Sequence, residues 1–411
     1  MKPVVGGSNS RYSHHRRHAS GRMTYEVLVE LRISVAELLR VVSLSQGVVQ
    51  RKNTMPVLSH VLLDAGTDAH GNGRLQITAT DLDVGIKASR PCEVISPGAV
   101  TIPARALADM VRVLPGPDVV LKRLPNQHVE VKSGRTKARL MALSADEFPA
   151  LPAYESATFV SVDQTLLINM VEKTLYAAST DETRYNLGGV YFEPPTNPDG
   201  PLTMVATDGH RLVRIERNFA GASEFKLRGP VILPRRGLSE LKRVLEGASE
   251  AIGDGSPLVE FGFHESHCVF RKGNTVLGMR LVEGQFPDYK QVIPKLADKV
   301  VRVAQRDLVD SLKRVSVLAS DKTQAVKLVL SKDQLVVSCT NTETGEISDD
   351  VPVEYAGASI EVAFNARYLV DALASLDDKN VLLKVTDNLS PGLLVGVDEP
   401  RHLCVVMPMR L

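Results

Sequence analysis

The chain has 411 residues, of which 44% are hydrophobic and 24% are charged, proportions typical of a globular protein with two to four domains of about 150 residues. Its formal charge is +1, but five basic residues and no acidic residue stand among the first 22, so the remaining chain has 44 basic and 48 acidic residues. This balance excludes a uniformly basic nucleic-acid-binding surface, and any DNA contact must come from a local patch. No apolar run approaches the roughly 20 residues of a membrane-spanning helix.

Residues 1–26 lack the apolar region of a signal peptide. We expect a disordered extension, a start placed upstream of Met23 or a remnant of cloning. His14, His15 and His18 could hold a metal adventitiously, but a solvated tail is the favoured interpretation. The cysteines are scattered without C-x-x-C spacing, which argues against a zinc site or a disulfide framework and indicates a cytoplasmic protein without metal or cofactor. They are Cys92, Cys268, Cys339 and Cys404.

The body of the chain begins with a strand, a helix, several strands, a second helix and further strands. Ser34 is a favourable N-cap for a helix that runs to about Ser45. The second helix spans Ala104–Leu114 and is ended by Pro115-Gly116. The predicted strands are Val27–Ile33, Val57–Leu63, Leu75–Ala79, Val84–Ala88, Val100–Pro103, Val119–Leu124, Val129–Lys132 and Lys137–Leu143.

This order of elements recurs with a period of about 130 residues. Pro103, Pro234 and Asn365 stand in matching motifs at intervals of 131 residues. The segments Pro56–Leu63, Tyr185–Phe192 and Thr323–Leu330 are predicted to be equivalent strands. We therefore expect three α+β domains, at 27–153, 154–297 and 298–411, each with two helices on one face of an antiparallel sheet of about eight strands. Such a row leaves open strand edges, which a closed ring of two chains would remove.

The segment Val205–Val213 predicts a hairpin, because Asp208-Gly209 lies between two apolar runs. Weaker copies follow the apolar runs at Leu75–Ile77 and Leu335–Val337. The repetition makes this turn a specialised copy of a structural element, with Asp208 holding the turn.

The predicted helices carry a small excess of positive charge. Taken together they hold twelve basic and eight acidic residues, over 34–47, 103–114, 163–176, 234–245, 305–318 and 365–376. A shared surface with this bias is suited to contact DNA phosphates independently of base sequence. The scarcity of aromatic residues beside these charges predicts a loose hold on DNA.

Four motifs give the chain a specific resemblance to a known family. Thr207–Leu212, Phe286–Tyr289, Phe364-Asn365 and the terminal Val406–Leu411 stand in the order found in bacterial sliding clamps, the beta subunits of DNA polymerase III. The resemblance covers Val27–Leu411. It implies three tandem DNA-clamp domains in a head-to-tail homodimeric ring that encircles duplex DNA and has no catalytic activity. It also implies that the ring tethers the polymerase III catalytic subunit, other polymerases and repair proteins, and is loaded by a clamp loader.

The resemblance further implies three sets of site residues. The pocket for partner peptides comprises Leu187, Thr207, Gly209, His210, Arg211, Leu212, Pro287, Val292, Asn365, Tyr368, Val405, Met407, Pro408, Met409 and Arg410. The DNA contacts are Arg40, Lys52, Tyr185, Arg235 and Arg236. The dimer interface centres on Leu140, Val317 and Leu318, with Arg135, Lys137 and Arg139 facing acids such as Asp321. Gln291, Leu389, Pro391 and Asn186 depart from the residues often found in the family.

Two alternatives compete with a ring clamp. A hydrolase or nuclease could use Asp208 and His210 as acid and base beside a metal, but the chain has no H-E-x-x-H, P-loop or G-x-S-x-G motif. A third group that would orient such a pair is not indicated either. The other alternative is a clamp-like scaffold that binds partner peptides and does not encircle DNA.

Overall fold

The structure is a computed structural model. It describes residues 29–410 apart from 50–54, 153, 155–156, 198–199, 219–220, 222–223, 226, 248–256, 296 and 321–322. The predictions for the N-terminal extension, Lys52 and Asp321 therefore lie outside the described residues, as does Leu411.

The first domain contains two helices and nine strands. Ser34 caps the first helix as predicted, since its hydroxyl accepts a hydrogen bond from the Glu37 amide at 3.1 Å. The elements are β1 Glu30–Ser34, α1 Val35–Ser45, β2 His60–Thr67, β3 Gly73–Thr80, β4 Val84–Pro91, β5 Glu93–Ser96, β6 Gly98–Pro103, α2 Ala104–Val111, β7 Asp118–Leu124, β8 His128–Ser133 and β9 Thr136–Met141.

The second and third domains repeat this plan with two helices and eight strands each. Asp163 and Asn365 take the N-cap role of Ser34 in front of α3 and α6. The second domain has β10 Thr158–Asp163, α3 Gln164–Leu175, β11 Gly189–Glu193, β12 Leu202–Thr207, β13 Arg211–Arg217, β14 Val231–Pro234, α4 Arg235–Gly247, β15 Leu258–His264, β16 His267–Lys272 and β17 Thr275–Arg280. The third has β18 Lys299–Ala304, α5 Gln305–Val315, β19 Ala325–Ser331, β20 Gln334–Asn341, β21 Gly345–Glu354, β22 Ile360–Asn365, α6 Ala366–Ser375, β23 Asn380–Val385, β24 Gly392–Gly396 and β25 His402–Val406.

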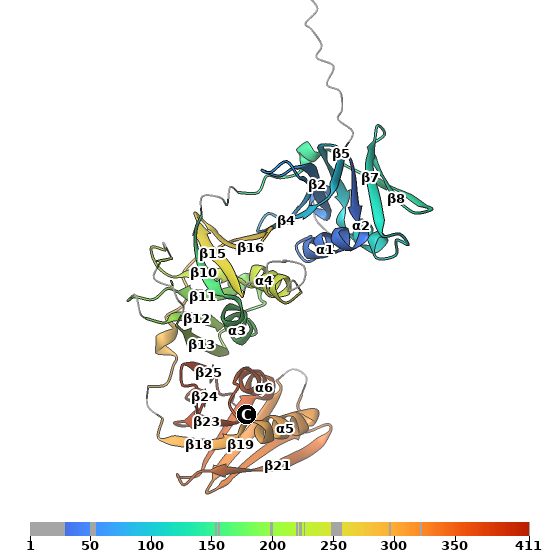
Figure 1. The fold of residues 1–411 in the computed structure, drawn as a ribbon. Helices are drawn as coiled ribbons and strands as arrows, with labels where there is room; N and C mark the ends of the chain where they lie inside the picture. Colours follow the sequence, from blue (N-terminus) through green and yellow to red (C-terminus); the bar gives the residue numbers. More distant parts are fainter. Residues whose placement is uncertain are drawn as a thin grey trace, which may run out of the picture.

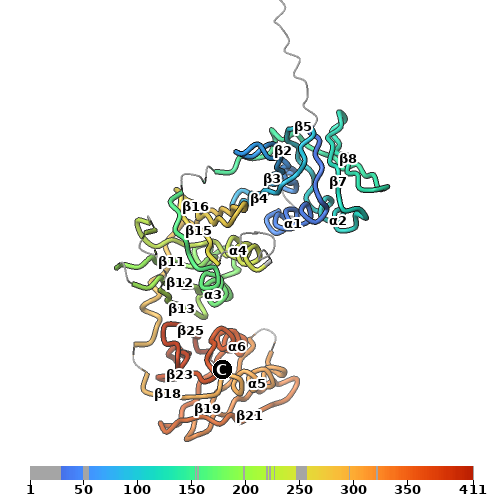
Figure 2. Tube along the Cα trace, viewed as in Figure 1, coloured from blue at the N-terminus to red at the C-terminus, as the bar shows by residue number. Residues whose placement is uncertain are grey.

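Both domain junctions are made by direct antiparallel strand pairing. At the first junction β4 pairs with β17, and at the second β13 pairs with β25. An eight-stranded sheet consequently spans the first two domains, and a twelve-stranded sheet spans the second and third. The three units form a single curved row in which the helices lie along the concave side (Figure 1), and the trace in Figure 2 shows the same curvature.

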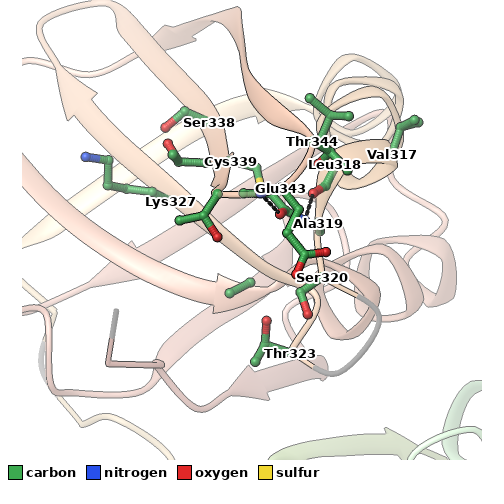
Figure 3. A pocket seen from close by; sticks show the side chains of 14 residues that line it. Val317, Leu318, Ala319, Ser320, Thr323, Lys327, Ser338, Cys339, Glu343 and Thr344 are labelled. Atoms are coloured by element: carbon green, nitrogen blue, oxygen red, sulfur yellow. Dashed lines mark hydrogen bonds between the residues drawn. The ribbon is translucent and has the colours of Figure 1, made fainter.

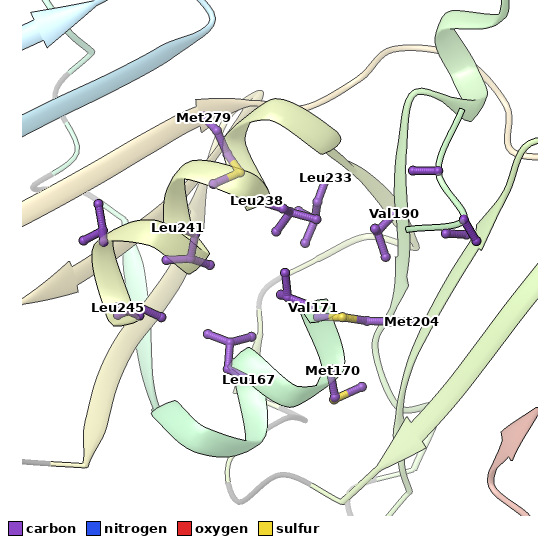
Figure 4. Packing of buried hydrophobic residues seen from close by; sticks show 14 of the residues in the cluster. Leu167, Met170, Val171, Val190, Met204, Leu233, Leu238, Leu241, Leu245 and Met279 are labelled. Atoms are coloured by element: carbon purple, nitrogen blue, oxygen red, sulfur yellow. The ribbon is translucent and has the colours of Figure 1, made fainter. Parts of the chain in front are cut away.

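The core of each domain lies between its helix pair and its sheet. In the second domain, α3 and α4 turn their apolar side chains toward one another and toward the strands (Figure 4). Leu167 of α3, Leu238 of α4 and Met204 of β12 are all at most 1% exposed. The apolar residues at helical spacing, which predicted two helices in each domain, thus form one buried face on each helix.

Some predicted boundaries are wrong. The segments Pro56–Ser59 and Glu182–Leu187 form 3-10 helices, so only the second half of each predicted strand is extended. Pro56 lacks an amide hydrogen and suits the first turn of a helix. The short β5 was not predicted, and α2 ends at Val111. Among the described residues, no helix is long and apolar enough to cross a membrane.

Candidate functional site

The hairpin turn between β12 and β13 is held by its own side chains. The Thr207 hydroxyl donates to the Arg211 carbonyl at 2.6 Å and accepts from the Gly209 amide at 3.1 Å. The Asp208 carboxylate accepts from the amides of His210 and Arg211 at 2.9 and 3.0 Å. Gly209 has a φ of +88°, a conformation that glycine adopts without strain. Asp208 therefore stabilises the turn.

The same bonds recur in the first domain, in the turn between β3 and β4. Thr80 bonds the Val84 carbonyl and the Leu82 amide, and the carboxylate of Asp81 accepts from the amides of Asp83 and Val84. Leu82 stands at the position of Gly209 with a φ of +83°. The repeat predicted from sequence thus extends to individual hydrogen bonds.

Arg211 joins the second domain to the third. Its guanidinium donates to Asp208 at 3.1 Å, to Asp371 of α6 at 2.6 Å and to the Tyr176 carbonyl at 2.8 Å. It also lies over the rings of Tyr176 and Tyr368, at 5.2 and 4.7 Å from their centroids. Burial lowers the pKa of Arg211, but the hydrogen bond to Asp371 and the negative charges of Asp208 and Asp371 outweigh it, so the pKa is raised overall. The Arg211 side chain is therefore held at the domain junction, where it lines a hollow together with His210 and Tyr368. Its place in a peptide pocket stays a prediction.

These contacts also remove the basis for a catalytic pair. The Asp208 carboxylate is engaged by two backbone amides and by Arg211, and the His210 ring is stacked on Tyr368 at a centroid distance of 6.3 Å. No third group orients His210 toward a substrate within the described chain. No three His, Cys, Asp or Glu side chains among the described residues come together in a way that could hold a metal ion.

A buried apolar cluster lies beside this turn, where β25 pairs with β13. Leu212 lies opposite Val405 in the strand register, and both belong to a buried cluster shared by the two domains. The C-terminal segment continues past the turn, because the Met407 amide donates to the His210 carbonyl at 2.9 Å. The Met409 amide then donates to Ala363 at 2.8 Å, which fixes the chain end against β22.

The predicted pocket residues differ in burial. The buried ones are Leu187, Thr207, Leu212 and Val405. The half-buried ones are Asn365, Tyr368, Met407, Pro408 and Met409. The exposed ones are Gly209, His210, Pro287, Val292 and Arg410. Of the predicted residues, His210, Arg211, Asn365 and Tyr368 line one hollow of about 710 Å³. Asn365 also caps α6, since its side chain accepts from the Tyr368 amide at 3.1 Å.

Sequence reasoning missed part of the buried apolar cluster at the second junction. Phe286, Tyr289, Leu393, Val395 and Leu403 belong to the same buried cluster as Leu212. Strand pairing explains Leu393, which lies opposite Val405 on β24. The buried aromatic ring of Phe286 stacks on Tyr191 at a centroid distance of 4.7 Å. The motif Phe286–Tyr289 was a signal that these two aromatic residues lie at the junction.

Most of the basic side chains on the predicted helices are paired with acids. Nine of the twelve basic residues on the predicted helices form ion pairs with nearby acids. Within the described chain, the side chains of Arg235, Lys313 and Arg367 are exposed and have no such partner. Arg235 and Arg367 line one hollow of about 710 Å³ where the second and third domains meet.

Two of the predicted DNA contacts have other partners. Arg236 forms an ion pair with the buried carboxylate of Asp81 and donates to the Val48 carbonyl at 2.9 Å, so it ties the first domain to the second. The Arg236 side chain is nevertheless 41% exposed, and its contact with DNA stays a prediction. Arg40 pairs with Glu37 at 2.7 Å, while Tyr185 is 64% exposed.

Two strand edges remain open at the ends of the row. Among the described residues, strand β9 pairs only with β8, and the first half of β21 pairs only with β20. Lys137 and Arg139 are exposed on β9, whereas Glu346 and Asp350 are exposed on β21. Beside β21, Val317 is 77% exposed and lines with Leu318 a hollow of about 880 Å³ (Figure 3). Leu140 on β9 is half-buried.

Three tandem copies of one α+β unit, joined through their sheets with the described α-helices on the concave side, define the DNA-clamp class of proteins. Sequence models of the DNA polymerase III beta subunit match in order: the N-terminal domain at residues 29–152, the central domain at 161–288 and the C-terminal domain at 290–410. The chain therefore belongs to the DNA polymerase III beta subunit family, the beta sliding clamps. Its function is that of a processivity factor in DNA replication and not that of an enzyme.

Curated relatives and solved structures agree with this family. The beta sliding clamp of Caulobacter vibrioides is 34% identical over 93% of this chain and 100% of that protein, and that of Escherichia coli is 32% identical over 91% and 98%. The solved beta sliding clamp of Caulobacter crescentus has a TM-score of 0.86 at 33% identity, covering 93% of this chain and 99% of its own. The sliding clamp of Bartonella birtlesii, solved bound to griselimycin, has a TM-score of 0.84 at 32% identity, covering 93% and 100%. These comparisons favour a sliding clamp over a scaffold that does not encircle DNA.

Proposed function

We propose that two copies of this chain close head to tail into a ring around duplex DNA in the cytoplasm. The ring tethers the polymerase III catalytic subunit, other polymerases and repair proteins, and a clamp loader places it on DNA. The observation that carries this proposal is the strand pairing at the two junctions within the chain. In each, the strand after the repeated turn pairs with the last strand of the next domain.

The same pattern of strand pairing identifies the two strands that would close the ring. Strand β21 follows the turn in the third domain, and β9 is the last strand of the first domain, so β21 of one chain pairs with β9 of the other. Their exposed charges are complementary, with acids on β21 and bases on β9. The exposed Val317 and the half-buried Leu318 and Leu140 supply the apolar part of this contact.

The repeat also sets the register of this contact. Val84 pairs with Met279 and Arg211 with Val406, which are equivalent positions of the first and second junctions. When the hairpins β16–β17 and β8–β9 are superimposed by their strand register, Leu140 is equivalent to Met279. When β12–β13 and β20–β21 are superimposed in the same way, Gly345 is equivalent to Arg211. Gly345 then faces Leu140, and the next pair brings Glu346 opposite Arg139.

A cysteine cross-link tests this register. We expect the double variant Arg139→Cys/Glu346→Cys to form a covalently closed dimer on oxidation, because directly opposed residues lie about 4.5–5.5 Å apart, within the range of a disulfide. The control pair Lys137→Cys/Glu346→Cys is diagonal, at about 7–8 Å, and should cross-link poorly. Non-reducing electrophoresis measures both products. Equal yields from the two pairs, or none from the first, would contradict the register.

Partner peptides occupy the apolar groove between β13, β25 and the C-terminal segment. The half-buried Met407 and Met409 provide an adaptable apolar wall for related peptides. The side-chain amide of Gln291 donates a hydrogen bond to Asp288 at 3.0 Å. Gln291 carries no positive charge at the edge of the groove. Leu389, which is 65% exposed, precedes β24 on the neighbouring turn. These departures favour partner peptides that are more apolar and less acidic.

DNA is held through its phosphates on the concave side. The three unpaired helix cations, with the exposed Arg40 and Tyr185, contact the backbone of the duplex without reading its sequence. So few free charges are consistent with a ring that slides, since strong retention comes from encirclement.

A further inference from the structure

The first domain junction has the walls of the peptide groove but a closed surface. Gly85 of β4 pairs with Gly278 of β17, at the positions where Leu212 pairs with Val405 in the second junction. Leu58 and Thr80 occupy the positions of Leu187 and Thr207, and both are 1% exposed. The two junctions thus share their floor but differ at the paired central residues.

The chain that links the first two domains covers these two glycines. A β-carbon at Gly85 would lie 2.7 Å from the Leu151 side chain, and one at Gly278 would overlap the ring of Tyr154. Tyr154 is only 5% exposed and lies against His267 at a centroid distance of 6.1 Å. Its burial raises the pKa of the Tyr154 hydroxyl to about 12. The absence of side chains at both glycines is therefore what allows the linker to settle on the sheet.

The second linker leaves its junction open. The matching motifs Phe148-Pro149 and Phe286-Pro287 place Val292 at the position of Tyr154. Val292 is 39% exposed, compared with 5% for Tyr154. The first junction thus has two glycines in its strand pair and the large side chain of Tyr154 in its linker. The second junction has Leu212 and Val405 in its strand pair and the smaller side chain of Val292 in its linker.

We propose that the first junction is a second peptide groove that the chain fills with its own linker, with Tyr154 as the plug. The inference rests on the proposed peptide-binding function of the second junction. The plug restricts each chain to one open groove, and a ring of two chains to two. It also fastens the first domain to the second, because Tyr154 and Leu151 pack on Gly278 and Gly85.

Removal of the plug tests the inference. We use griselimycin as the probe and measure its stoichiometry by titration calorimetry up to millimolar concentration. The parent chain should bind one molecule per chain, and the Tyr154→Ala variant should bind two, the second at least tenfold more weakly because Leu212 and Val405 are replaced by glycine there. A folded Tyr154→Ala variant that binds one molecule overturns the inference. If Tyr154→Ala does not fold, Tyr154→Val, which copies Val292, is measured with the same two outcomes.

The reciprocal variant makes the second test. The double variant Val292→Tyr/Val405→Gly places the equivalents of Tyr154 and Gly278 in the second junction. We expect its affinity for griselimycin to fall at least tenfold. The control Val405→Gly alone should lose less, since it leaves the groove unfilled. Equal losses in the two variants would overturn the role of the aromatic plug. Failure of the parent chain to bind griselimycin would instead count against the proposed groove itself.

Discussion

Deletion of Met407–Leu411 lowers the affinity for a polymerase-derived clamp-binding peptide by about 100-fold or more and leaves the chain folded and dimeric. Strand β25 ends at Val406, so its pairing with β13 survives the deletion. The lost Met407, Pro408 and Met409 are half-buried walls of the groove. Burying an apolar side chain contributes about 1.5–3 kcal/mol, so losing two such contacts corresponds to at least two orders of magnitude in affinity.

Fluorescence anisotropy with the labelled peptide measures this loss, and light scattering measures the dimer. The matched control is deletion of Arg410 and Leu411 alone, which removes an exposed end and keeps both methionines. We expect that control to bind within a few-fold of the parent chain. Full affinity after the longer deletion would mean that the peptide binds elsewhere.

Neutralising Arg235 and Arg367 together weakens DNA binding more than neutralising any two of the ion-paired helix cations. Both side chains are exposed and unpaired in the described chain, and both line the same hollow. Each phosphate contact contributes about 0.9 to the slope of log affinity against log salt. In the Arg235→Gln/Arg367→Gln variant, the magnitude of this slope should therefore decrease by nearly two. The loss of DNA affinity relative to the parent chain should be clearest at moderate salt.

The matched control is Arg112→Gln/Arg306→Gln, which removes the same charge from helices of the same concave surface. Arg112 pairs with Asp109 at 2.7 Å and Arg306 with Asp310 at 3.8 Å. Because these cations are already neutralised locally, the slope should change by less than one. Binding to duplex DNA at several salt concentrations gives both slopes, and equal changes would show that ion pairing does not select the DNA contacts.

Local chemistry explains why much of the fold could be predicted. Ser34 and Asn365 cap helices through side-chain hydrogen bonds, and Asp208-Gly209 makes a turn from bonds within four residues. Such interactions depend only on neighbouring residues, so they are visible in a sequence. The period of the repeat then supplied the three domains and the equivalence of their turns.

Long-range pairing explains what could not be predicted. Arg236 resembles any exposed helix cation in sequence, and only the fold brings Asp81 from another domain to it. Arg211 is likewise committed by Asp371, which lies 160 residues away. The contrast between Tyr154 and Val292 needed the strand register, since neither residue is unusual by itself. Sequence reasoning therefore named residues around the junction of the second and third domains, but it could not show which of their side chains cross from one domain to another.

The most direct test of encirclement compares circular and linear DNA. The ring is loaded on a nicked circular plasmid, closed through the Arg139→Cys/Glu346→Cys pair and washed at about 1 M salt, where exposed charge interactions are screened beyond about 3 Å. We expect the cross-linked ring to stay on the circle and to be released when one restriction cut linearises it. Release from the intact circle, or retention on the linear product, would contradict a closed ring around DNA.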